Sequence, residues 1–239
     1  MPFTAASIMK RASTILQDAD AVRWTAVELR DWLNEAQRSI IIAKPNALSK
    51  TITIDLEEGT KQPVPDNVAI LSRVMRNVSG SGKAIKTLAR REILDNQVPN
   101  WHSSDGLPFA ADVSMVWQDE MGMREFYVIP GNDGTGQIEA IVGVQPTNVP
   151  LPTGDVLDME NYDAELDFDD SYQGILLDLV LYRAFSKDSA SPDAANRAQV
   201  HLGAAVSQMQ AVGNAQAAYS LANHYGSSMM AAPAPAPQQ

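Results

Sequence analysis

Residues 24–56 read WTAVELRDWLNEAQRSIIIAKPNALSKTITIDL, and the spacing of apolar residues changes within this stretch. Thr25 and Glu28 have the T-x-x-E spacing of a capping box, in which each side chain accepts a hydrogen bond from a backbone N–H that the helix leaves free. Apolar residues then recur at helical spacing as far as Pro45, whereas residues 51–56 alternate and are rich in β-branched side chains. The sequence therefore predicts a helix that is followed by a strand with one buried face.

A second helix is expected before this one, because the apolar residues Ile8, Ala12, Ile15 and Leu16 recur at helical spacing. Thr4 or Ser7 would cap it. In the helix after the capping box, the apolar face consists of Leu29, Trp32, Leu33, Ala36, Ile40 and Ala43. Trp24 and Leu29 have the placing of a hydrophobic staple around its cap.

The middle of the chain favours strands, which we expect at residues 51–56, 72–78, 110–118, 125–129 and 137–144. In the second of these, alternation places Val74, Arg76 and Val78 on one side of the strand. Residues 59–65 read as a turn, residues 66–71 as a short helical turn capped by Asp66, and residues 90–96 as one or two helical turns. Residues 131–136 are rich in Gly and Asn, which tolerate positive φ, so we expect a hairpin loop there.

Helices return after an acidic stretch that contains no basic residue: Asp155, Asp158, Glu160, Asp163, Glu165, Asp167, Asp169 and Asp170. Asp169, Asp170 or Ser171 would cap a helix whose apolar residues run from Ile175 to Phe185. Ser191-Pro192 opens a last helix, which we expect to reach about residue 214 and to continue weakly to Tyr225. Residues 231–239 are Ala/Pro-rich and should be extended.

These elements predict an α+β fold, a helical bundle of N- and C-terminal helices with an inserted β-rich domain. The helical domain is expected to comprise residues 1–48 and 168–225, and the β-rich domain residues 49–167, with a flexible tail at residues 226–239. The apolar stripes of the helices would hold the bundle together, since each buried Trp, Leu or Ile contributes roughly 1.5–3 kcal/mol.

The composition of the chain disfavours several classes of function. The 239 residues carry a formal net charge of −11, so general affinity for nucleic acid is not expected. Cysteine is absent, which suits a reducing cytoplasm and excludes thiol chemistry. No signal peptide or bilayer-spanning segment is expected, because the first residues lack a basic region and the run from Ile175 to Phe185 is short and charged.

No catalytic, cofactor-binding or metal site is predicted. His102, His201 and His224 are far apart and have no metal-ligand spacing. The Gly-rich residues 131–136 are followed by a strand pattern and not by the helix that a phosphate loop needs. The acidic stretch lacks the spacing of a calcium loop, and nothing singles out a pair of carboxylates for hydrolysis. A DNA-reading helix-turn-helix in residues 8–42 is disfavoured by its acidic connection.

Several stretches resemble the head-to-tail adaptor (connector or neck) proteins of podovirus-type, short-tailed bacteriophages. They are, in chain order, Arg11–Asp18, Arg23-Trp24-Thr25, Glu28–Arg38, Val64-Pro-Asp66, Leu94-Asp95, Pro99-x-Trp101-His102, Phe126–Pro130, Pro146, Leu181–Asp188 and Asn196-Arg-Ala198. The resemblance covers the chain up to about Met209. The stretch from Ala211 departs from it, and the acidic stretch before Asp167 is longer than usual.

The resemblance implies a structural virion protein without enzymatic activity and without cofactors, made in the host bacterial cytoplasm. It implies a ring, dodecameric in such adaptors, that lies beneath the portal protein, extends the DNA channel and offers a platform to tail and nozzle proteins. DNA would pass through without specific binding, and no membrane is involved. The alternatives are another neck or tail-completion protein and a small carboxylate-dependent hydrolase.

Two groups of residues become candidate contacts in this setting. C-terminal segments of such adaptors often dock into the portal, and adaptable apolar side chains near this end are Tyr219, Tyr225, Met229 and Met230. Acidic residues suit a channel along which DNA slides, and the candidates are Asp155, Asp158, Glu160, Asp163 and Glu165.

Overall fold

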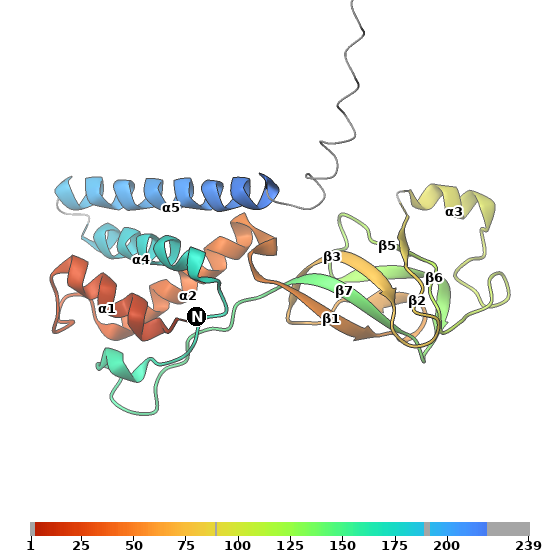
Figure 1. Cartoon of the computed structure of the whole chain (residues 1–239), viewed down its shortest axis with the longest axis horizontal. Coiled ribbons are helices and arrows are strands. Elements are labelled where there is room, and N and C mark those ends of the chain that lie inside the picture. The colour runs from red at the N-terminus through yellow and green to blue at the C-terminus, as the bar shows by residue number, and fades with distance from the viewer. Residues whose placement is uncertain (1–2, 89, 189–191, 219–239) are drawn as a thin grey trace, which may run out of the picture. The chain divides into compact units, whose positions relative to one another are not determined.

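The computed structural model describes residues 3–88, 90–188 and 192–218. It has an α+β fold, in which helices at both ends of the chain flank a β-rich region, as the sequence predicts (Figure 1). The chain forms two compact units: residues 1–37 with 148–239, which we call the helical unit, and residues 38–147, which we call the β unit. Among the helices of the described ranges, none is long and apolar enough to cross a membrane.

Four helices build the helical unit, and their caps follow the predicted signals. α1 (Ala5–Leu16) is capped by the Thr4 side chain, which accepts from Ser7 N, and α2 (Ala26–Ala43) begins at the predicted capping box and runs into the β unit. Asp169 caps the short 3-10 helix η3 (Asp170–Tyr172), which leads into α4 (Gln173–Lys187). α5 (Pro192–Ala218) is the longest helix, and the short η2 (Met159–Asn161) precedes η3 in the chain.

α4 occupies the centre of this unit. It packs against both α1 and α5, which is why its side chains are apolar on nearly every face. Its fully buried residues are Ile175, Leu176, Val180, Leu181 and Ala184. Ile8, Ala12 and Leu16 of α1 are buried as predicted, but Ile15 is about half exposed and lies outside the apolar face.

The described residues of the β unit form two sheets, the short 3-10 helix η1 and the short helix α3. One sheet has the order β1-β7-β3 and is antiparallel; the other has the order β2-β6-β5-β4 and is mixed (Figure 1). The elements are η1 (Pro45–Leu48), β1 (Ser49–Asp55), β2 (Glu58–Pro63), β3 (Val68–Asn77), β4 (Lys86–Thr87), α3 (Arg91–Gln97), β5 (Met115–Trp117), β6 (Glu125–Asp133) and β7 (Gln137–Val144).

Three predictions between residues 59 and 78 are wrong. Residues 59–65 are not a turn, because β2 runs through most of them and places Gly59 beside a register shift in its pairing with β6. No helical turn follows Asp66; β3 begins at Val68 and pairs with β7. Three register shifts in β3 also break the expected alternation, so that Asn77 is fully buried.

Two further predictions need correction. Of the strand expected at residues 110–118, only β5 forms, together with an isolated bridge at Ala110. The loop at residues 131–136 does not close a hairpin, because β6 and β7 pair with different strands in different sheets. Gly134 has the positive φ that the composition predicts, but the turn carries the chain from one sheet to the other.

Candidate functional site

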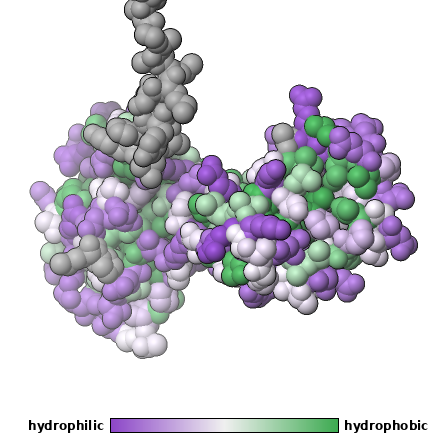
Figure 2. Space-filling view, turned by 45° about the vertical axis from the view of Figure 1, so that its right-hand side comes forward, coloured by the Kyte–Doolittle hydropathy of each residue, from purple (hydrophilic) through white to green (hydrophobic). Residues whose placement is uncertain are grey.

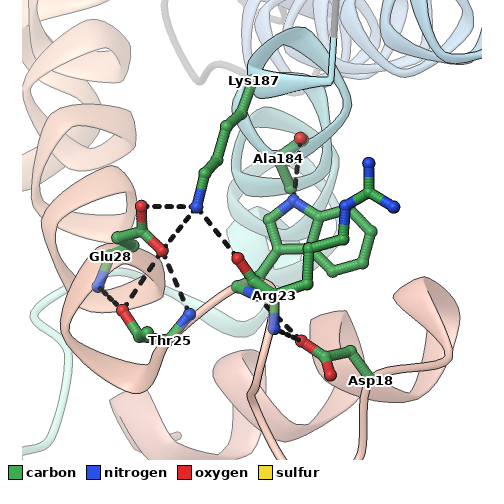
Figure 3. A network of polar contacts seen from close by, with 7 residues as sticks. Asp18, Arg23, Thr25, Glu28, Ala184 and Lys187 are labelled. Atoms are coloured by element: carbon green, nitrogen blue, oxygen red, sulfur yellow. Dashed lines mark hydrogen bonds and ion pairs between the residues drawn. The ribbon is translucent and has the colours of Figure 1, made fainter. Parts of the chain in front are cut away.

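The loop between α1 and α2 is held by the carboxylate of Asp18 (Figure 3). This carboxylate accepts hydrogen bonds from the backbone N–H groups of Val22, Arg23 and Trp24 at 3.1, 2.9 and 2.9 Å. The hydrogen bond from Trp24 is the main reason why the pKa of Asp18 lies below its usual value. One aspartate thus shapes the entry of the chain into α2.

The first turn of α2 is joined to the last turn of α4 by Glu28 and Lys187. The carboxylate of Glu28 accepts from Thr25 N at 3.1 Å, and Thr25 Oγ1 accepts from Glu28 N at 3.3 Å, which completes the capping box. Lys187 Nζ donates to both Glu28 oxygens, at 2.7 and 2.9 Å, and to Arg23 O at 2.9 Å. The hydrogen bond from Lys187 is the largest cause of the lowered pKa of Glu28.

Trp24 adds an apolar contact to this junction. Its side chain is buried, and its indole N–H donates to the carbonyl of Ala184 at 3.0 Å (Figure 3). That carbonyl lies in the last turn of α4, where helix carbonyls lack intrahelical partners. An ion pair between Arg23 and Asp188 also joins the residues just before α2 to the residue just after α4. We call the residues Asp18, Arg23, Trp24, Thr25, Glu28, Ala184, Lys187 and Asp188 the α2–α4 junction.

The α2–α4 junction brings together three stretches that carry the resemblance to phage adaptors. The end of Leu181–Asp188 is about 160 residues away in the chain from Arg23-Trp24-Thr25 and from the start of Glu28–Arg38, yet side chains of the two regions contact each other. The shared residue types at these positions therefore have a structural role, which is to fix α4 against the α1–α2 pair.

The acidic stretch lies along the N-terminus of α1. Backbone hydrogen bonds join Ala5 N to Ala164 O at 2.9 Å and Leu166 N to Phe3 O at 3.0 Å. Four apolar residues of the stretch are buried (Met159, Tyr162, Leu166 and Phe168), whereas Val156, Leu157 and the acidic residues are exposed. All five predicted channel-facing residues are exposed: Asp155, Asp158, Glu160, Asp163 and Glu165.

Two of these acidic residues have local roles as well. Asp158 caps η2 by accepting from Glu160 N at 2.9 Å, and Glu160 forms an ion pair with Lys10 of α1. The helical unit as a whole holds seven Lys and Arg against sixteen Asp and Glu, and the β unit eleven against thirteen. Most of the net negative charge of the chain therefore belongs to the helical unit.

The predicted partner-binding residues Tyr219, Tyr225, Met229 and Met230 lie outside the described residues. Within these ranges, the visible face of both units shows hydrophilic residues interspersed with apolar ones (Figure 2). Hydropathy alone therefore does not single out a partner surface on that face.

The central motif of the resemblance forms a small apolar cluster in the β unit. Trp101 is buried with Leu94 and Ile129, and its indole N–H donates to Asp95 at 2.8 Å. This hydrogen bond is the main cause of the lowered pKa of Asp95. His102 stacks on Trp101, with ring centroids 3.6 Å apart, and its Nδ1 lies 2.8 Å from Thr60 Oγ1. Partial desolvation lowers the pKa of His102, although the residue is exposed at the surface.

The described residues offer little for catalysis. No group of three or more His, Asp or Glu side chains within these ranges is placed to hold a metal ion. Each carboxyl group with a shifted pKa in this part of the chain has it lowered, by hydrogen bonds or ion pairs: Asp18, Glu28, Asp95, Asp133, Glu139 and Asp169. A glycosidase-like pair needs one carboxyl group with a raised pKa.

Sequence reasoning missed three buried asparagines that hold extended segments in place. Asn34 of α2 accepts from Val149 N at 2.7 Å and donates to Val149 O at 3.2 Å. Asn77 binds both backbone groups of Val113 at 2.8 Å. Asn132 donates to the carbonyls of two alanines, and its own oxygen accepts from two glycine N–H groups of the turn before β7.

A family model described as SU10 adaptor protein matches residues 3–228, nearly the whole chain. No curated protein matches the sequence.

Proposed function

Because the chain belongs to the SU10 adaptor protein family, we propose that it forms a head-to-tail adaptor ring beneath the portal protein of a bacteriophage virion. Membership makes the chain a phage structural protein that associates with other virion components. The ring, its position in the neck and its contacts go beyond what family membership gives, and they are the proposal. The observation that carries them is the family match over residues 3–228, which includes all of the residues of the α2–α4 junction.

The ring would contain twelve copies and extend the DNA channel of the portal. In such a ring the helical unit, residues 1–37 and 148–239, would lie near the portal, and the β unit, residues 38–147, would be available to tail and nozzle proteins. A rigid helical domain suits this role, and the α2–α4 junction supplies rigidity by joining three segments at one corner.

The acidic stretch is proposed to face the channel. Its carboxylates are exposed, while Met159, Tyr162, Leu166 and Phe168 are buried and anchor it to the helical unit. A negative wall repels the phosphate backbone, and DNA then passes without sticking. The concentration of net charge in the helical unit supports the same placement.

The C-terminal segment is proposed to dock into the portal through Tyr219, Tyr225, Met229 and Met230. Sedimentation of purified portal with the protein tests both proposals, because twelve bound copies of a 25.9 kDa chain add a large and countable mass. Removal of residues 219–239 should weaken this binding at least about tenfold while the thermal unfolding of the remaining chain is unchanged. Full binding by the truncated chain would overturn the docking proposal, and no binding by the intact chain would overturn the adaptor position.

A further inference from the structure

The two sheets of the β unit have four edge strands, and three of them carry features that hinder pairing with another chain. β3 contains three register shifts, and residues 83–85 bond along its end. β2 contains a register shift and ends in Pro63, and β4 is two residues long. Bulges, prolines and shortness are the usual means by which proteins protect an open edge.

β1 is the exception. All seven of its residues pair with β7 without a register shift, and it contains neither proline nor glycine. It stands at the end of its sheet, and Figure 1 shows it along the margin next to β7. A regular edge strand of this length is a template for a further strand.

The direction of the free backbone groups follows from one hydrogen bond. Leu56 N donates to Gly136 O at 2.9 Å, in continuation of the β1–β7 register. In an antiparallel ladder the groups of alternate residues point to the same neighbour, so the even-numbered residues of β1 bond to β7. The N–H and C=O groups of Ser49, Thr51, Thr53 and Asp55 therefore point away from the sheet.

We infer that β1 pairs antiparallel with β1 of a second copy, about a two-fold axis through Ile52. Thr51 then faces Thr53 of the second copy, and Ile52 faces its own equivalent. Thr–Thr and β-branched pairs directly opposite each other stabilise antiparallel strands. Thr51 and Thr53 are exposed and lie on the polar face, whereas Ile52 is half-buried and lies on the same face as the buried Ile54. The pairing thus keeps the threonines and the isoleucine at the axis on their own faces, and it places Lys50 opposite Ile54 of the second copy.

Charge favours the same arrangement. Lys50 is the second residue of β1, Asp55 is its last residue, and Glu57 follows two positions later. Antiparallel pairing brings the basic end of each copy to the acidic end of the other, whereas parallel pairing would bring like charges together. The three protected edges of the same chain offer no comparable partner strand, so the second copy meets β1 through its own β1.

A two-fold contact closes after two copies, so this dimer is a state of the free protein and not the contact that builds a ring. Sedimentation velocity of the full chain alone, at concentrations up to the millimolar range, should show a species of twice 25.9 kDa. Hydrogen exchange at the amides of Thr51 and Thr53 should slow as the dimer forms.

Thr53→Pro removes an outward N–H and leaves the hydrogen bonds to β7 in place, so it should raise the dimer dissociation constant at least about tenfold. The control Thr53→Val keeps the N–H and the strand propensity and should dimerise like the original chain. The double variant T51K/T53K places lysines opposite lysines and should also be monomeric, with an unchanged circular dichroism spectrum.

A monomer at every concentration, or dimers that persist in both Thr53→Pro and T51K/T53K, would overturn the inference. The inference would also be overturned if hydrogen exchange at the Thr51 and Thr53 amides of the intact chain slowed only after another virion protein was added. The inference does not depend on the proposed function: failure to bind the portal would leave the dimer untouched, and Thr53→Pro should bind the portal as the original chain does.

Discussion

Replacing Glu28 with alanine tests the α2–α4 junction. The change removes the acceptor of Thr25 N and both hydrogen bonds from Lys187. The lost capping hydrogen bond should cost about 0.5–1.5 kcal/mol. The ion pair adds only about 0.2–1 kcal/mol, because the side chains of Glu28 and Lys187 are 36% and 42% exposed. The free energy of unfolding should therefore fall by about 1–2 kcal/mol.

Urea denaturation followed by circular dichroism at 222 nm measures this loss. With a dependence of about 1–3 kcal/mol per molar urea, the midpoint of the helical transition should fall by roughly 0.5–1 M. A double-mutant cycle with Lys187→Ala should give a coupling energy of about 0.3–1 kcal/mol. Asp193→Ala is the matched control: it breaks the exposed ion pair with Arg197 in α5, which joins no two helices, and should cost about 0.5 kcal/mol or less.

The loss should depend on pH. The pKa of Glu28 is lowered in the folded protein, so its contribution is fully present above the ordinary glutamate range, about pH 4–5, and disappears as pH falls through the lower folded pKa. The difference between the original chain and Glu28→Ala should be constant from neutral pH to about pH 5 and should shrink in more acidic solution. Equal losses for Glu28→Ala and Asp193→Ala, or a coupling energy near zero, would refute the proposed role of the junction.

Two further predictions concern the helical unit. Asn34→Ala should lower the free energy of unfolding by about 2–3 kcal/mol in the same urea assay, because it leaves both backbone groups of Val149 without their partner in a buried site. The control Asn161→Ala removes an exposed hydrogen bond to Asp155 O and should cost less than about 1 kcal/mol. Equal losses for the two variants would contradict the role of Asn34. A variant with Asn or Gln in place of the acidic side chains would neutralise the acidic stretch at Asp155, Asp158, Glu160, Asp163 and Glu165. The assembled ring of this variant should bind DNA more tightly at low salt, as measured by fluorescence anisotropy. An unchanged affinity for DNA would contradict the proposed place of the acidic stretch in the channel.

The helices could be predicted because their signals are local. Thr4, the Thr25/Glu28 box and Asp169 each bond to a backbone N–H within three residues, so a short window of sequence contains the whole interaction. The central position of α4 could be anticipated in part from its nearly continuous apolar run.

The strands were harder because their structure depends on distant partners. Gly59 and Pro63 indicate a turn in isolation, yet both belong to β2, where the pairing with β6 accommodates them at a register shift and at the strand end. The alternation of β3 fails for the same reason, since its register shifts are set by β7 and not by its own residues.

The candidate site was predicted only in outline. The resemblance marked Trp24, Glu28 and Lys187, but the contact between them joins residues about 160 positions apart and has no signal in periodicity. The buried asparagines escaped prediction because Asn is usually a surface or turn residue, and their partners are backbone groups 21 to 115 residues away or in the adjoining turn.

Electron cryomicroscopy of the protein mixed with its cognate portal, with the protein alone as control, would show whether the protein assembles on the portal. We expect a ring of twelve copies there, with the helical unit nearest to the portal and the acidic stretch along the channel. Particles in which the portal remains bare, or in which the protein binds away from the channel axis, would contradict the adaptor position.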